Sequence, residues 1–98
     1  KMENHQIKLI DNTYSKNEAK DLLSALINDK IRFLKQKIFS IQERTGGDTS
    51  YHEKRIAELQ HEKAQLVKKF NALENVKFNV EIDCHAYLKI KEEEKVFA

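Results

Sequence analysis

The stretch VKFNVEIDCHAYLKI, residues 76–90, decides the fold. Its even-numbered positions are all apolar, and its odd-numbered positions are polar except for the amphipathic Tyr87. Alternation with a period of two over this length is typical of a β-strand with one buried face, and we place that strand at residues 77–91. A strand of this length would extend about 45–50 Å, so it needs a cover of similar length.

A helix predicted at residues 16–44 supplies one part of that cover. The capping box SKNE, residues 15–18, opens the helix, and the pair Gly46 and Gly47 ends it because glycine tolerates the left-handed conformation of a helix C-terminus. Apolar residues form two stripes that cover about half the circumference, so we expect this helix to contact two surfaces. The first stripe is Leu23, Ile27, Ile31, Leu34, Ile38 and Ile41, and the second is Leu22, Leu26 and Phe33.

A second helix is predicted at residues 51–75, opened by the capping box SYHE at residues 50–53. Its apolar residues form one narrow stripe, in which Leu59, Leu66 and Leu73 recur every seventh residue. This register suits antiparallel packing along the first helix, and two heptads are too few for an extended coiled coil. The two helices therefore predict a hairpin that is about 40 Å long, close to the length of the strand.

The remaining element is a short strand at residues 5–10, where Ile7 and Leu9 alternate with polar residues and Asp11 marks the end. The order strand, helix, helix, strand predicts an α+β fold, β-α-α-β, in which a long antiparallel helical hairpin packs on a small antiparallel sheet. With short connections, the short strand can pair with the long strand only as far as about Asp83.

The rest of the long strand is then expected to lack a partner within the chain. A long unpaired strand edge is a template for another chain, and an isolated two-stranded sheet is marginally stable. We therefore predict a homodimer whose sheet is extended by dimerisation, through Cys84, Ala86, Leu88 and Ile90. The alternative is a bend at residues 83–85, which would divide the long strand into two shorter strands.

The composition is that of one folded domain, predicted at residues 2–98. Charged residues make up 35% and apolar residues 40% of the chain, and the net charge is only +2, so charge says little about the partner. One cysteine excludes an internal disulfide, and no apolar run approaches the ~18 residues of a membrane span, so we expect a cytoplasmic protein with no membrane partner. We take Met2 as the native start and expect a frayed tail at residues 92–98.

Catalytic, cofactor and metal sites are not expected. None of the four histidines shows the i, i+4 spacing of a zinc-binding helix. Cys84 and His85 are neighbours in a strand, so their side chains point to opposite faces. Asp83, His85 and Tyr87 share the outward face, but proton transfer there would require a concave surface opposite them.

A basic and aromatic patch is predicted on the first helix. Arg32, Lys35 and Phe39 project from the side opposite the apolar stripes, and Arg44 lies in the last turn. An exposed aromatic side chain among cations suits an anchor for a protein partner or stacking with single-stranded nucleic acid. We therefore expect a non-enzymatic protein-interaction or structural module, and a nucleic-acid-associated protein is the alternative.

The segment LLSALINDKIRFLKQKIFSIQERTGG, residues 22–47, followed by EKRIAEL, residues 53–59, resembles a family of short uncharacterised bacterial proteins with strand-helix-helix-strand organisation. The resemblance implies this fold and a bacterial origin. It implies no activity, cofactor or catalytic residue.

Overall fold

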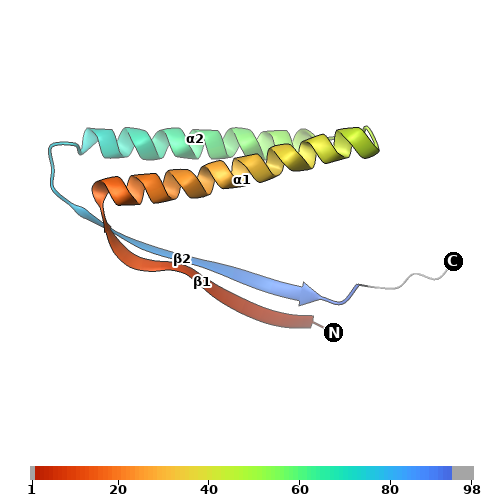
Figure 1. Ribbon diagram of the computed structural model, residues 1–98, viewed down its shortest axis with the longest axis horizontal. Helices are drawn as coiled ribbons and strands as arrows, with labels where there is room; N and C mark the ends of the chain where they lie inside the picture. Colours follow the sequence, from red (N-terminus) through yellow and green to blue (C-terminus); the bar gives the residue numbers. More distant parts are fainter. Residues whose placement is uncertain (1, 94–98) are drawn as a thin grey trace.

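Four elements build the chain in the order β1 (Met2–Ser15), α1 (Lys16–Arg44), α2 (Ser50–Ala72) and β2 (Asn79–Lys91). The computed structural model describes residues 2–93, so residues 94–98 of the predicted tail lie outside the described residues. Helices α1 and α2 form an antiparallel hairpin, strands β1 and β2 form a two-stranded antiparallel ribbon, and α1 lies between α2 and the ribbon (Figure 1). The predicted α+β fold with β-α-α-β order is confirmed.

Strand β1 is more than twice as long as the strand predicted at residues 5–10. It pairs with β2 along its whole length, with Met2 opposite Lys91 at the far end. The predicted overhang is therefore wrong, because every residue from 84 to 90 has a strand partner within the chain. Residues 11–15 are mostly polar, so hydrophobic alternation does not reveal them as strand; their backbone groups pair with β2 instead.

Strand β1 contains a β-bulge at Leu9. Lys8 lies opposite His85, and Ile10 lies opposite the next residue of β2, Cys84. Leu9 therefore has no residue opposite it. The extra residue shifts the alternation of side chains, so Ile7 and Ile10 lie on the same face, while Leu9 is 57% exposed. The predicted alternative, a bend at residues 83–85, is also wrong, because β2 is continuous there and the irregularity lies in the opposite strand.

Two hydrophobic clusters hold α1. In the first, all four elements meet: Ala19 of α1 is fully buried against Ile10, Ile82 and Phe70, from β1, β2 and α2 respectively. The second lies within the hairpin and consists of Ile31, Leu34, Ile56 and Leu59. Helix α1 therefore contacts two surfaces, as predicted, although the hairpin and the ribbon diverge away from the Ala19 end (Figure 1).

The second predicted stripe of α1 reflects this divergence. Leu22 packs against the first cluster, whereas Leu26 is 40% exposed and Phe33 is 57% exposed. Lys30 covers part of Phe33, with its Nζ atom 5.3 Å from the ring centroid. None of the helices among the described residues is long and apolar enough to cross a membrane.

Helix α1 occupies the predicted range and has the predicted capping box. Ser15 Oγ accepts a hydrogen bond from the Glu18 N–H (3.3 Å), and Glu18 Oε1 accepts one from the Ser15 N–H (3.2 Å). These bonds, with the side chain of Ser15 as the larger cause, lower the pKa of Glu18 from its ordinary value of 4.5. Beyond the end of the helix at Arg44, Gly46 has a φ of +63°, the predicted left-handed stop.

Helix α2 begins differently from the prediction. Its N-cap is Thr49, whose side chain makes no capping hydrogen bond, so the predicted capping box at residues 50–53 is wrong. The Asp48 carboxylate instead accepts hydrogen bonds from the Ser50 hydroxyl and from the Ser50 backbone N–H (2.9 Å). Both bonds, the hydroxyl's first, lower the pKa of Asp48. The helix ends at Ala72 rather than at residue 75.

Replacement of Ala19 by leucine is expected to destabilise the fold by about 1–3 kcal/mol, because the added methyl groups would force apart four packed elements. The matched control is Ala25→Leu, an exposed position on the same helix, which should change the free energy of unfolding by less than about 0.5 kcal/mol. Urea denaturation followed by circular dichroism measures both. Equal effects would contradict the packing at Ala19.

The capping box predicts a pH dependence. Because the pKa of Glu18 is lowered in the folded state, the ionised cap stabilises the fold above the unfolded-state pKa, and this stabilisation is lost as the pH falls through the folded-state pKa. Wild type should therefore be more stable than Glu18→Gln at neutral pH, and the difference should vanish once the pH is well below the lowered folded-state pKa of Glu18. Urea titrations at several pH values test this, and a difference independent of pH would refute it.

Candidate functional site

We call the end of the ribbon where Ser15 lies opposite Asn79 its base. The ribbon face that packs on α1 is buried at this base and exposed toward the chain termini. Ile82 is 7% exposed, whereas Leu88 is 39% and Ile90 is 52% exposed. On β1, Ile7 lies on the same face and is 39% exposed. We define the distal ribbon as residues 2–8 of β1 and 85–91 of β2. Its inner face carries the apolar side chains of Ile7, Ala86, Leu88 and Ile90, with Glu3 and His5 of β1 opposite Ile90 and Leu88. The hairpin diverges from this part of the ribbon (Figure 1).

The four residues predicted for self-association all lie on the inner face of the ribbon, because side chains alternate along a strand, and Cys84 lies just outside the distal ribbon. They differ in exposure. Cys84 is a free thiol, half-buried against the cluster around Ala19. Ala86 is also half-buried, so Leu88 and Ile90 provide the large exposed apolar side chains of β2 in this region.

The outer face of the ribbon brings together the three polar residues predicted to share it. The His85 ring stacks on the Tyr87 ring with centroids 6.2 Å apart, and His85 Nε2 contacts Asp83 Oδ1. The Gln6 side-chain nitrogen lies 3.0 Å from His85 Nδ1. Sequence reasoning missed Gln6 because it left this part of β2 without a strand partner. Since Tyr87 is 76% exposed and the Asp83 side chain 68%, the cluster is open to solvent rather than set in a concave site.

Charged residues on the outer face of β2 are separated by sign. Glu81 and Asp83 lie toward the base, whereas Lys89 and Lys91 lie at the distal end, and all four are exposed. Within residues 2–93, the side chains of Glu81, Lys89 and Lys91 form no hydrogen bond or ion pair, and Asp83 contacts His85. Strand β2 therefore has an acidic half and a basic half.

The basic and aromatic patch predicted on α1 is only partly assembled. Arg32, Lys35 and Phe39 share one face because they are spaced by three and four residues, and Phe39 is 64% exposed. The Arg32 guanidinium, however, binds Asp29 at 2.9 Å. Arg44 lies five residues after Phe39 in the same unbroken helix, about 140° around its axis, so it does not join the patch.

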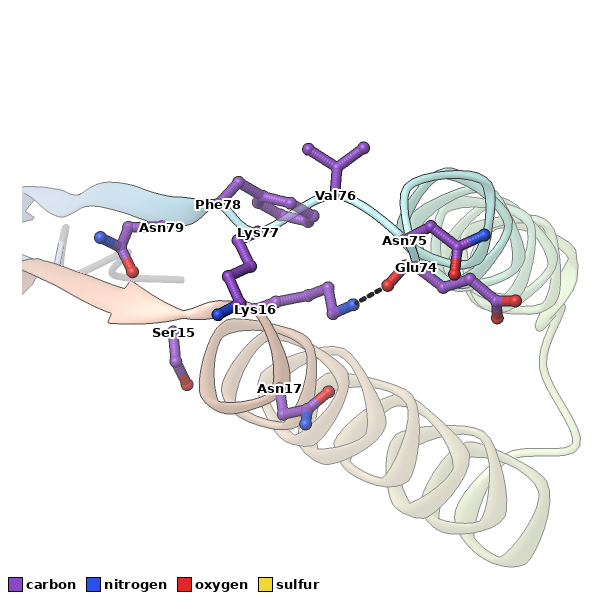
Figure 2. Close-up of a pocket in the computed structure, with 9 residues that line it drawn as sticks. All are labelled: Ser15, Lys16, Asn17, Glu74, Asn75, Val76, Lys77, Phe78 and Asn79. Atoms are coloured by element: carbon purple, nitrogen blue, oxygen red, sulfur yellow. Dashed lines mark hydrogen bonds between the residues drawn. The ribbon is translucent and has the colours of Figure 1, made fainter.

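A depression lies where the two connections between strands and helices meet (Figure 2). Lys16 Nζ donates a hydrogen bond to the backbone carbonyl of Glu74 (2.9 Å) and lies 5.8 Å from the centroid of the Phe78 ring. Phe78 packs edge-on against Phe70, with centroids 5.7 Å apart. Lys16 therefore joins the start of α1 to the segment after α2. Sequence reasoning missed this contact because its acceptor is a backbone carbonyl 58 residues away.

In the described part of the chain, no group of three His, Cys, Asp or Glu side chains could hold a metal ion. Comparison with protein-family models, curated proteins and solved structures gives no match to this chain. The resemblance to bacterial strand-helix-helix-strand proteins therefore stays a prediction.

Substitution of Lys16 by methionine is expected to lower the free energy of unfolding by about 1 kcal/mol. The substitution keeps the apolar stem and removes the hydrogen bond to Glu74 and the charge beside Phe78. Lys35→Met, at an exposed position of the same helix, is the control and should be nearly neutral. Equal stability of the two variants in urea would show that the Lys16 contact adds nothing to the fold.

Proposed function

We propose that this chain is a non-enzymatic interaction module that works as a homodimer and self-associates through β2. The observation that carries this proposal is the distal ribbon, where the two strands diverge from the hairpin and leave Leu88 and Ile90 exposed (Figure 1). The first step of the function is therefore association with a second copy, and the helical hairpin is left as a surface for a further protein partner.

The exposed inner face of the distal ribbon supports this proposal. A two-stranded sheet is marginally stable in water unless further strands or a helix cover it. The base of the ribbon has such a cover, since Ile10 and Ile82 are 8% and 7% exposed. Leu88 and Ile90 lack it, and covering a large aliphatic side chain fully stabilises a structure by about 1.5–3 kcal/mol. Association that covers this face is therefore favourable.

The free edges of the ribbon give the same indication. Among the described residues the sheet has only two strands, so each strand has one edge without a strand partner. Such edges are templates for pairing with another chain. The edge of β2 is the more regular one, because the bulge at Leu9 interrupts β1.

The alternative, nucleic-acid binding through the patch on α1, has weaker support. Binding to phosphates requires several free cations on one surface. Arg32 is already paired with Asp29, and Arg44 lies on another side of the helix. The net charge of +2 adds no general attraction to nucleic acid.

Sedimentation velocity at micromolar concentrations tests the proposal, with a dimer as the expected result for wild type. The variant Ile90→Glu should be a folded monomer, because position 90 is already half-exposed within one chain. The matched control Phe39→Glu alters an even more exposed apolar side chain, on α1, and should remain a dimer. A monomeric wild type would refute self-association, and dissociation by Phe39→Glu alone would move the interface to α1.

A further inference from the structure

We propose that two copies of this chain pair antiparallel through the free edges of β2, with Ala86 of one copy opposite Ala86 of the other. The product is a four-stranded sheet in the order β1–β2–β2–β1, with a twofold axis at Ala86. This inference rests on the proposed self-association and adds its partner strand, direction and register.

The separation of charge along β2 favours this arrangement. With the axis at Ala86, Glu81 lies opposite Lys91 of the second copy and Asp83 lies opposite Lys89, and symmetry repeats each pair. Glu81, Lys89 and Lys91 have no side-chain partner among the residues that the structure describes. Cross-strand pairs of opposite charge stabilise a sheet, and like charges directly opposite each other destabilise it. A parallel pairing in register would place every charge opposite itself.

Other antiparallel registers keep fewer of these pairs. An axis between two residues would place inner-face residues opposite outer-face residues and so mix the apolar and polar faces. An axis at His85 keeps Glu81 opposite Lys89 but places Asp83 opposite Tyr87. An axis at Tyr87 keeps only Asp83 opposite Lys91. The register at Ala86 alone gives both acidic residues a lysine.

The same register also continues the apolar core from one copy to the other. Ile82, buried under the hairpin of its own chain, lies opposite Ile90 of the second copy, which is 52% exposed in the single chain. Cys84 lies opposite Leu88 in the same way. The base of each copy therefore lies beside the distal ribbon of the other copy. The contact occurs twice, as in any isologous interface.

Strand β1 fits a second copy less well. Its outer-face charges, Lys8 and Asp11, already bind each other at 3.1 Å, and the bulge at Leu9 lies between them. The outer face of a β1 edge therefore has no pair of free charges to set a register, and β1 lacks a regular run of the length of β2.

Disulfide formation at the axis tests the register. The variant Ala86→Cys in a Cys84→Ala background carries one cysteine, which would lie about 5 Å, Cα to Cα, from its copy in the dimer, within disulfide reach. Oxidation should convert it to a covalent dimer. Wild-type Cys84 is the control: it would lie about 14 Å from its copy along the strands and should not cross-link. Cross-linking of wild type instead of the variant would overturn the register.

Charge reversal provides an independent test. The double variants Glu81→Lys/Asp83→Lys and Lys89→Glu/Lys91→Glu each place like charges opposite one another, so each should dimerise at least about tenfold more weakly than wild type. A mixture of the two should form heterodimers, and the quadruple variant that combines all four substitutions should regain the wild-type dissociation constant. Circular dichroism checks that every variant is folded.

The outcomes separate this inference from the proposed function. A wild type that sediments as a monomer refutes self-association itself. If wild type is a dimer but charge reversal has no effect, self-association stands and the register at Ala86 is overturned. The same holds if the quadruple variant fails to regain the affinity that the double variants lose.

Discussion

The fold depends on the contact at Ala19. Because alanine is small, α1 can approach Ile10 and Ile82 closely, and Phe70 brings α2 to the same point. Strand β1 leads directly into α1, and Lys16 holds the segment after α2 against the start of that helix. All four elements are therefore fixed at one end of the molecule. Toward the other end the hairpin has its own cluster and the ribbon has none, so the two diverge (Figure 1).

The elements that sequence reasoning predicted well have local signals. Strand β2 shows an alternation that only Tyr87 blurs, and α1 has a capping box and a glycine stop at its ends. Strand β1 has no such signal over its full length. The bulge at Leu9 shifts its alternation between Ile7 and Ile10, and residues 11–15 are mostly polar. Its length is determined by pairing with residues that lie 64 to 89 positions later in the chain, which no local pattern contains.

The same distinction applies to the surfaces. The alternation of side chains along a strand alone predicted that Asp83, His85 and Tyr87 share a face, and the structure confirms it, with His85 in contact with both Asp83 and Tyr87. Gln6 could not be added without the register of β1. The start of α2 was predicted wrongly because two local solutions compete, and the carboxylate of Asp48 engages the hydroxyl that a capping box would use.

Complete pairing of β1 with β2 changes the physical reason for self-association. A partner of an unpaired overhang would satisfy free backbone groups. In the proposed dimer, a partner would instead extend the two-stranded ribbon and bury apolar side chains of its inner face. One helix, about 10 Å wide, could cover a two-stranded ribbon, but the packing of Ile31 and Leu34 on α2 directs α1 away from it. No other described residue supplies this cover, and the proposed dimer would supply part of it from a second copy. A second copy has a covered base whose edge matches the distal ribbon in length, polarity and charge.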